Sequence, residues 1–363
     1  MDAGVELPEY QLFIHPSAVS ELRKDIWIED PVAAKLTINK KKYAVDIAYR
    51  GSHIRDLRKK SYQLSFYKPD TYRNAKEVHL NAEFKDPSLL RNKLSFDFFN
   101  DIGCLAPNSR FVFIKINGKN EGVYLELESV DEHFLANRQL PEGSLYYAVD
   151  GDANFSLMSD LDKEAKKSLK LGYEQKYGTA QADEQLQHLI MNINTIPREE
   201  FEHEIVKYVN VDKYLCWLAG VICTQNFDGF VHNYALYRNG DTGQFEIIPW
   251  DYDATWGRDV HGESMQADYL RIEGFNTLTA RILDVKTFRT HYKNLLEGIV
   301  KSTFNVDYMK PKIQAMHDLI RPYIQKDPYE KDNIDLFDKE PDFICAYIEA
   351  RGNYITSQLD TWD

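Results

Sequence analysis

The spacing of the apolar residues changes about one third of the way along the chain, and this change constrains the fold more than any other feature. Residues 42–49 and 61–67 are rich in β-branched and aromatic side chains with partial alternation. From residue 129 onward, apolar positions instead recur at helical spacing, as at Leu295 and Ile299. A two-residue period is typical of strands, and a period near 3.6 of amphipathic helices. The sequence therefore predicts an α+β fold with a β-rich N-terminal lobe and a mainly helical C-terminal lobe.

Local signals suggest where these two parts begin and end. Asp86 is a candidate N-cap for a helix that Gly103 would close. Asn117-Gly118 separates two alternating runs and indicates a β-hairpin. We therefore expect a β-rich lobe over residues 1–128 with one helix, and a mainly helical lobe over residues 129–363 with one inserted hairpin.

The composition is that of a globular protein with an acidic balance. Its 363 residues suggest about two domains, and 44 Lys and Arg against 57 Asp and Glu give a formal net charge of −13. This charge argues against nucleic acid or an anionic membrane as a partner, because both require a basic binding face. The four cysteines lack zinc-site spacing, and no segment has the pattern of a signal peptide or a membrane span. We expect a cytosolic monomer with reduced thiols.

One segment of the C-terminal part combines residues that suit phosphoryl transfer. It follows an apolar helix for which Asp212 is the expected N-cap. Asp228 is followed five residues later by Asn233, then by two short strand patterns, and then by Asp251 and Asp253. Phosphoryl transfer needs a carboxylate that orients the attacking hydroxyl, and protein kinases supply the metal ligands as an Asn and an Asp in this order. We therefore predict Asp228 as the catalytic residue, and Asn233, Asp251 and Asp253 as ligands of Mg²⁺ or Mn²⁺.

Each of these motifs also has a purely structural explanation. Asp228 could begin an Asx-turn, Asn233 could cap an element, and the Asp-Tyr-Asp motif at 251–253 could be a solvated turn. For either motif alone this is the commoner outcome, and only the ordered combination favours phosphoryl transfer. The His-Arg-Asp and Asp-Phe-Gly triplets of typical protein kinases are absent. A kinase with this sequence would therefore be an atypical one.

A basic loop in the N-terminal part is a candidate site for the phosphates of ATP. Between Arg50 and Lys60, five basic residues stand against one acid, Asp56. Backbone amides and basic side chains can bind phosphate oxygens in such a loop, although an isolated basic run is more commonly solvated. Lys60, or alternatively Lys59, would contact the α- and β-phosphates. The predicted nucleotide-binding residues are Arg50, Gly51, Ser52, Arg55, Lys59, Lys60, Arg91, Glu126 and Glu128.

Five segments together resemble the spore coat protein H (CotH) family of Bacillus-type bacteria. They are RGSHIRDLRKKSYQLSFY, HLNAEFKDPSLLRNKLSFDFF, NGKNEGVYLELESVDE, NFDGFVHNYALYR and IPWDYDATWGRD. The resemblance implies a two-lobed, atypical protein-kinase-like fold and a kinase that uses ATP and a divalent cation. Such a kinase would phosphorylate serine residues of other spore coat proteins, chiefly basic, serine-rich proteins of the CotB and CotG type. Asp228 matches the family's catalytic aspartate, and Asp251 matches its metal-binding aspartate.

The resemblance also implies a role in coat assembly and germination, and a location in the mother-cell cytoplasm and then in the spore coat. Two other functions stay open: a kinase for a small-molecule or lipid acceptor, and a catalytically inactive, kinase-like coat scaffold. The presence of Asp228, Asn233 and Asp251 favours an active enzyme. A glycosyltransferase that uses the Asp-Tyr-Asp motif is less favoured, because the sequence has no recognisable sugar-nucleotide domain.

Overall fold

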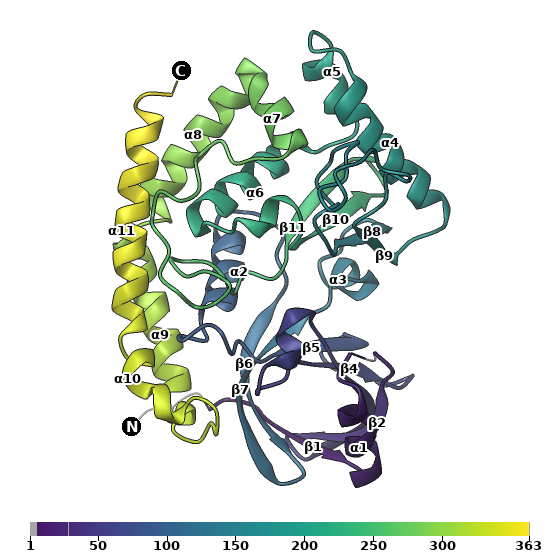
Figure 1. Ribbon diagram of the computed structural model, residues 1–363, viewed down its shortest axis with the longest axis vertical. Helices are drawn as coiled ribbons and strands as arrows, with labels where there is room; N and C mark the ends of the chain where they lie inside the picture. The colour runs from purple at the N-terminus through teal and green to yellow at the C-terminus, as the bar shows by residue number, and fades with distance from the viewer. Residues whose placement is uncertain (1–5, 28, 363) are drawn as a thin grey trace. The chain divides into compact units, whose positions relative to one another are not determined.

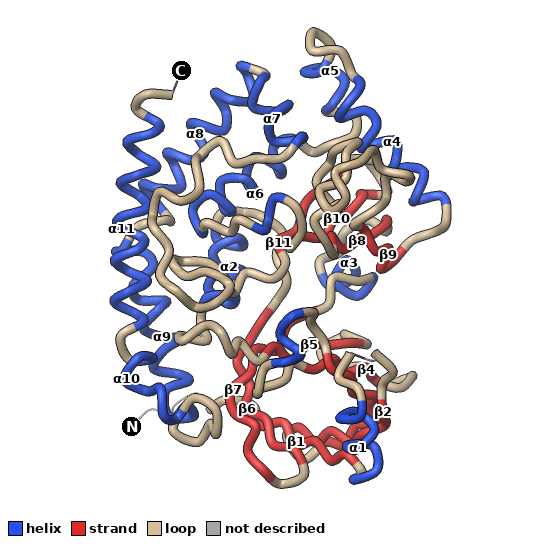
Figure 2. Tube along the Cα trace, viewed as in Figure 1, coloured by secondary structure: helices blue, strands red, loops and turns tan. Residues whose placement is uncertain are grey.

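The computed structural model describes residues 6–27 and 29–362, and the chain divides into two compact units (Figure 1). Unit 1 comprises Met1–Lys93, Asn108–Ser129 and Lys310–Phe343, and unit 2 comprises Leu94–Pro107, Val130–Met309 and Ile344–Asp363. Strands dominate the N-terminal region of the sequence and helices the C-terminal region, as the colours of Figure 2 show. The predicted α+β fold class is confirmed. The assignment of residues 1–128 and 129–363 to two functional lobes stays a prediction.

Unit 1 is built around a closed seven-stranded barrel. Its strands are β1 (Glu9–Ile14), β2 (Val32–Ile38), β3 (Lys41–Tyr49), β4 (Tyr62–Phe66), β5 (Glu77–Asn81), β6 (Ser109–Ile116) and β7 (Lys119–Glu128). The order around the barrel is β1-β2-β3-β4-β5-β7-β6, and every neighbouring pair is antiparallel except β1 with β6. Closure pairs the edges that an open sheet would expose to other chains.

The alternating sequence pattern explains how the barrel is filled. In β2, Val32, Ala34, Leu36 and Ile38 are all buried, and the residues between them are more exposed. Side chains of this kind from all the strands form one apolar cluster. At the tip of the β6–β7 hairpin, residues 117 and 118 have φ values of 50° and 80°. The predicted Asn-Gly hairpin is therefore confirmed, since Asn and Gly tolerate this backbone conformation best.

Helix α2 (Arg91–Asp101) begins later than the sequence predicted. The Asp86 carboxylate accepts a hydrogen bond from the backbone N of Arg91 at 2.9 Å, five residues on, instead of capping a helix that starts beside it. Leu89 has a φ of 56°, which is outside the helical range and delays the first turn. Gly103, with a φ of 88°, follows the helix as predicted.

Unit 2 contains a four-stranded antiparallel sheet in the order β11-β10-β8-β9. Its strands are β8 (Gly143–Ala148), β9 (Tyr173–Tyr177), β10 (Tyr234–Asn239) and β11 (Phe245–Pro249). The sequence predicted β10 and β11 as an inserted hairpin, and that hairpin is confirmed. It did not predict β8 and β9. No residue of β9 is fully buried, so the strand lacks the alternation that would have revealed it.

The helices account for most of the remaining described chain. Besides α2 they are α1 (Pro16–Lys24), α3 (Glu132–Asn137), α4 (Gln181–Thr195), α5 (Phe201–Ile205), α6 (Val211–Thr224), α7 (Thr277–Asp284), α8 (Lys286–Ser302), α9 (Val306–Ile324), α10 (Ile334–Phe337) and α11 (Glu340–Leu359). Within the described residues, none of these helices is both long and apolar enough to cross a lipid bilayer.

Helix α6 is the buried element of unit 2 from which the candidate site extends. Every residue from Tyr214 to Thr224 is buried, and the helix packs against α8 and β11. Its N-cap is Asn210, whose side chain accepts a hydrogen bond from the backbone N of Lys213. The predicted cap, Asp212, instead lies in the first turn, where a negative charge is favourable to the helix dipole.

Candidate active site

The end of α6 positions the loop that carries Asp228. Gln225 adopts the left-handed conformation, with φ 61° and ψ 45°, and stops the helix. The next residue, Asn226, is buried and makes two side-chain hydrogen bonds. Its Oδ1 accepts from the backbone N of Gly229 at 3.1 Å, and its Nδ2 donates to the backbone O of Asp251 at 3.3 Å. Asn226 therefore joins the two backbone segments that carry predicted site residues, a role that the sequence did not reveal.

Asp228 begins a short 3₁₀ helix, η2 (Asp228–Phe230). Its backbone O accepts hydrogen bonds from the backbone N of Val231 at 3.1 Å and of His232 at 2.9 Å. Its side chain is 34% exposed, and its Oδ2 lies 3.9 Å from Nε2 of His232. The tight turn thus fixes the backbone while the carboxylate stays open to solvent. A carboxylate held in this way can orient an incoming hydroxyl and accept its proton.

The β10–β11 hairpin brings Asn233 and Asp251 to the same end of the sheet. Tyr234 pairs with Pro249, and the backbone N of Trp250 donates to the backbone O of Asn233 at 3.1 Å. Asn233 and Asp251 both have a left-handed backbone, with φ values of 58° and 60°. Asn and Asp adopt this conformation more readily than other non-glycine residues. Their identity therefore suits the backbone as well as the predicted chemistry.

Tyr252 anchors the Asp-Tyr-Asp motif. Its ring is fully buried, with centroids 6.3 Å from the ring of Phe96 and 5.1 Å from that of Phe99. Burial raises the pKa of its phenol well above the usual value. Asp251 is exposed and Asp253 is half-buried. The motif therefore consists of one apolar anchor between two accessible carboxylates.

The oxygen atoms of Asn233, Asp251 and Asp253 are the donor type that Mg²⁺ prefers. In the part of the chain that the structure describes, no three side chains of His, Cys, Asp or Glu come together as a metal site. Mg²⁺ commonly keeps several waters and uses one or two carboxylates together with substrate phosphates. Two carboxylates and one amide oxygen are therefore donors of the type that would suit Mg²⁺.

The buried side chain of Arg55 makes hydrogen bonds within the predicted phosphate loop of unit 1. Its side chain is only 6% exposed, and its guanidinium donates to the backbone O of Gly51, to the backbone O of Trp27 at 3.0 Å, and to Oε1 of Glu29 at 2.7 Å. Gly51 has a φ of 90°, and a Cβ there would lie 2.4 Å from Cγ1 of Ile54. Glycine is therefore required at this turn for both backbone and steric reasons.

Three other predicted residues of this loop are more accessible. Ser52 is exposed, and Arg50 and Lys60 are half-buried. Arg50 donates a hydrogen bond to Oδ1 of Asn81, and Lys60 donates one to the backbone O of Arg55. Both side chains keep part of their surface in solvent, where a phosphate group could approach them.

Lys59 is instead part of a buried ion pair within unit 1. Its Nζ lies 2.9 Å from Oδ2 of Asp327 and 2.7 Å from the backbone O of Val123, and neither charged side chain is exposed. The Nζ also lies 4.9 Å from the centroid of the Tyr124 ring. A Cβ on Gly122 would come within 1.9 Å of Asp327 Oδ2, so glycine makes room for the pair. Sequence reasoning missed Asp327.

Arg91 lies in a second buried ionic cluster of unit 1. It is fully buried, and its Nη1 contacts the carboxylate of Asp86 and lies 2.8 Å from Oε2 of Glu340. Two carboxylates at one guanidinium satisfy the charge of Arg91 without a ligand. Its role in nucleotide binding stays a prediction.

The two glutamates predicted on β7 differ in their surroundings. Glu126 is buried and lies 3.0 Å from Nε of Arg110, and the hydroxyl of Tyr10 donates to it. Burial and the neighbouring Glu126 charge raise the pKa of Tyr10. Glu128 is half-buried and accepts a hydrogen bond from the backbone N of Asn108 at 2.9 Å. The assignment of both glutamates to nucleotide binding stays a prediction.

Comparison with known proteins assigns the family. The sequence matches the family described as CotH kinase protein over residues 47–355. The chain belongs to the CotH family. It is 62% identical over 353 residues to the inner spore coat protein H of Bacillus subtilis, covering 97% of this chain and 98% of that protein.

Two further relatives have lower sequence identity to this chain. The inner spore coat protein H-like protein of B. subtilis is 28% identical over 307 residues, covering 83% of this chain and 86% of that protein. Spore coat protein homolog 1 of Rhizopus delemar is 24% identical over 259 residues, covering 67% of this chain and 41% of that protein.

Solved structures give weaker similarities. The Helicobacter pylori proinflammatory kinase CtkA matches 82% of this chain and 94% of its own, with a TM-score of 0.33 and 11% identity. HipA of Shewanella oneidensis, in its complex with HipB and operator DNA, matches all of this chain and 77% of its own, with a TM-score of 0.38 and 14% identity. TM-scores at this level are too low to assign a function.

Proposed function

We propose that this CotH protein is an ATP-dependent protein kinase that phosphorylates serine residues of other spore coat proteins. The single observation that carries the proposal is the joining of two segments by Asn226, which ties the turn of Asp228 to Asp251. Membership of the CotH kinase family and similarity to a spore coat protein of B. subtilis support the reaction class and the setting.

In this proposal Asp228 accepts a hydrogen bond from the serine hydroxyl, orients its Oγ toward the γ-phosphorus, and takes up the proton. A bond forms between Oγ and phosphorus, the bond from phosphorus to the β-γ bridging oxygen breaks, and ADP leaves. Asn233 and Asp251 would hold Mg²⁺, with Asp253 as a further oxygen donor. The cation would neutralise the charge on the phosphates.

The nucleotide phosphates are a separate part of the proposal. We assign Lys60 and Arg50 to them, because these two keep surface in solvent among the basic residues predicted to bind the nucleotide. Lys59 would support the loop through its ion pair with Asp327 and would not touch phosphate itself. Replacement of Lys60 should therefore raise KM for ATP while the thermal stability changes little.

The test is phosphate transfer from radiolabelled ATP to a basic, serine-rich peptide in the presence of Mg²⁺. Asp228→Ala and Asp251→Ala should each lower the rate by at least about 100-fold, the size expected for loss of a positioned acid-base group or metal ligand. Asp241→Ala is the matched control, because Asp241 is an exposed carboxylate of the same unit in the β10–β11 turn.

Full labelling by either site variant would refute the assignment of that residue. Absence of labelling by the parent protein, together with no thermal shift on addition of ATP and Mg²⁺, would favour an inactive coat scaffold instead. Labelling of a lipid or small-molecule acceptor in preference to the peptide would move the protein to another class of kinase.

A further inference from the structure

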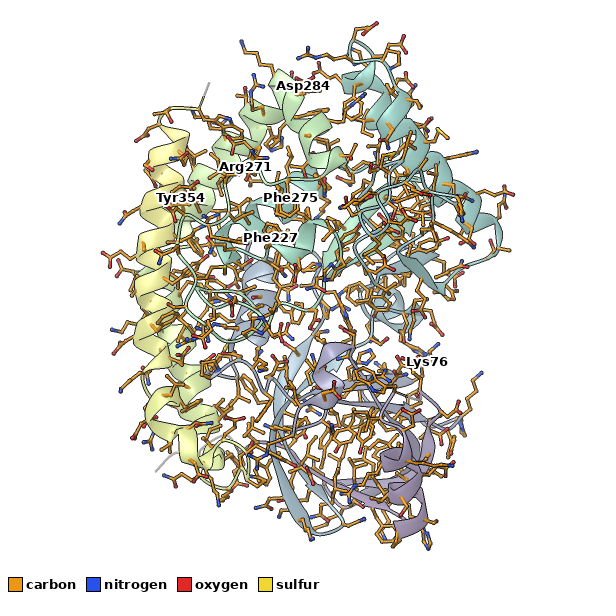
Figure 3. All side chains as sticks on the ribbon, in the orientation of Figure 1. Lys76, Phe227, Arg271, Phe275, Asp284 and Tyr354 are labelled. Atoms are coloured by element: carbon orange, nitrogen blue, oxygen red, sulfur yellow. The ribbon has the colours of Figure 1, made fainter. Side chains whose placement is uncertain are left out.

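An exposed group of aromatic rings lies directly beside Asp228 in unit 2. Phe227 precedes the aspartate in the sequence, and its ring centroid lies 5.7 Å from that of Tyr269 and 4.5 Å from that of Phe275. Phe227 is 42% exposed and Tyr269 is 59% exposed. Figure 3 shows Phe227 and Phe275 close together. We call Phe227, Tyr269 and Phe275 the aromatic platform.

The platform is held in place by the core beneath it. The ring of Phe275 lies 4.7 Å from that of Phe230, which is fully buried and lies 5.9 Å from the ring of Trp217. Asn276 donates from Nδ2 to the backbone O of Phe230 at 3.0 Å, and its Oδ1 accepts from the backbone N of Thr279 at the start of α7. The exposed rings of the platform are therefore mounted on fixed elements, as the anchors of binding surfaces usually are.

The segment that carries Tyr269 is acidic. Without Asp251 and Asp253, which the proposed function assigns to the cation, residues 254–274 contain four Asp and Glu side chains and two Arg side chains, a formal net charge of −2 with histidine neutral. Asp268 and Glu273, on either side of Tyr269, are both exposed. Arg271 is the exposed cation nearby in Figure 3, and its Nε donates to the backbone O of Gly274 at 3.2 Å. Aromatic faces bordered by carboxylates attract cationic side chains, by cation–π and charge–charge interactions.

We propose that the aromatic platform binds an Arg or Lys side chain of the acceptor protein, close in sequence to the serine that is phosphorylated. Phe227 and Asp228 are consecutive, so their Cα atoms lie about 3.8 Å apart, and an extended peptide advances about 3.3 Å per residue. The cation should therefore stand within roughly three residues of the acceptor serine. This inference rests on the proposed function, because Asp228 is taken as the residue that orients the serine.

The experiment compares two short fluorescent peptides, each with one serine. The residues that flank the serine are Arg in the first peptide and Gln in the second, and the peptides are otherwise identical. Binding is measured by fluorescence anisotropy and phosphorylation by steady-state kinetics. The double variant Phe227→Leu/Tyr269→Leu keeps apolar bulk but removes the π faces, whereas Phe227→Tyr and Tyr269→Phe retain them. Leu161→Ala, at an exposed apolar position of the same unit, is the control.

We expect the double variant to weaken binding of the Arg peptide, and to raise its KM, by roughly 3- to 30-fold, the range for cation–π contacts. KM for ATP and binding of the Gln peptide should stay unchanged, Phe227→Tyr and Tyr269→Phe should retain the affinity for the Arg peptide, and Leu161→Ala should behave as the parent. Equal losses for the Arg and Gln peptides would overturn the proposal, and so would no loss for either.

The binding measurement separates this proposal from the proposed function. Selective binding of the Arg peptide without phosphorylation would support the platform and refute the kinase assignment. Phosphorylation without any dependence on the platform rings would refute the platform and leave the kinase assignment standing. If the double variant instead abolishes self-association in sedimentation velocity, a second copy of the chain covers these rings and the proposal is wrong.

Discussion

Replacement of Lys59 by Met tests the buried ion pair of unit 1. The Lys59 Nζ lies 2.9 Å from Asp327 Oδ2, and neither side chain is exposed. Removal of one partner of such a pair leaves an uncompensated buried charge, which costs about 3–5 kcal/mol. Asp327 would keep hydrogen bonds from the backbone N of Val123 and of Tyr329, both at 2.9 Å. These donors stabilise the carboxylate that has lost its cation. We therefore expect the free energy of unfolding to fall by an amount near the lower limit, about 3 kcal/mol.

The assay is thermal unfolding followed by circular dichroism, together with urea unfolding. For a unit of about 150 residues, 1 kcal/mol corresponds to about 2–4 °C in Tm, so Lys59→Met should lower Tm by about 6–12 °C. Lys207→Met is the matched control. It removes an exposed ion pair of Lys207 with Glu204, three residues away, and should not change Tm measurably.

A double variant tests whether Lys59 and Asp327 stabilise each other. Lys59→Met/Asp327→Leu removes both charges and should recover part of the loss, because no buried charge is left without a partner. If Lys59→Met unfolds at the same temperature as Lys207→Met, the pair does not stabilise unit 1. Asp327→Leu alone completes the cycle. If the stability lost by the double variant equals the sum of the losses in Lys59→Met and Asp327→Leu, the two side chains do not interact in the way that we infer.

Three further predictions concern individual side chains. Gly122→Ala should destabilise unit 1 by about 1–3 kcal/mol in urea unfolding, because φ of Gly122 is 108° and a Cβ there would lie 1.9 Å from Asp327 Oδ2. An unchanged midpoint of urea unfolding would contradict that close contact. Burial raises the pKa of Glu330 above its usual 4.5, so the folded state loses stability as pH rises through the folded-state value. Glu330→Gln should therefore be more stable than the parent at about pH 8 and lose that advantage at about pH 4 in urea titrations, and a gain confined to low pH would show that the sign is wrong. A hydrogen bond from Cys104, at an Sγ–Sγ distance of 2.8 Å, lowers the pKa of the Cys216 thiol. Cys104→Ala should therefore shift the pH profile of Cys216 alkylation to higher pH. An unchanged profile would argue against the hydrogen bond between the two thiols.

Much of the fold could be predicted because its signals are local. Partly alternating apolar residues predicted β3 and β4, and Asn117-Gly118 predicted the β6–β7 hairpin from the backbone conformation that these residues tolerate. Strands β1, β2 and β5 were not predicted. The prediction missed β9, which has no buried face, and the late start of α2, where Asp86 bonds to a backbone N five residues away. Neither feature could be predicted, because the periodic spacing of apolar residues does not specify it.

The order of Asp228, Asn233 and Asp251 could likewise be read as a candidate site from the sequence. The contacts that hold these three residues in place could not be predicted from the sequence. Asn226 stands two residues before Asp228, and its amide could have been noticed as a possible side-chain bridge, but its second partner is the backbone of Asp251, 25 residues away. Only a folded chain shows which of many polar side chains makes such a bridge.

By itself, the sequence determined the α+β class, the acidic balance and the two hairpins, and it predicted a set of residues for phosphoryl transfer, because these follow from residue type and short-range spacing. Tertiary structure alone distinguished Lys59 from Lys60. The two are chemically identical neighbours, yet Lys59 is buried against Asp327, 268 residues away, and Lys60 keeps part of its surface in solvent. The reason is physical: burial and ion pairing depend on which distant segments meet, and residue type and spacing along the chain do not specify that meeting.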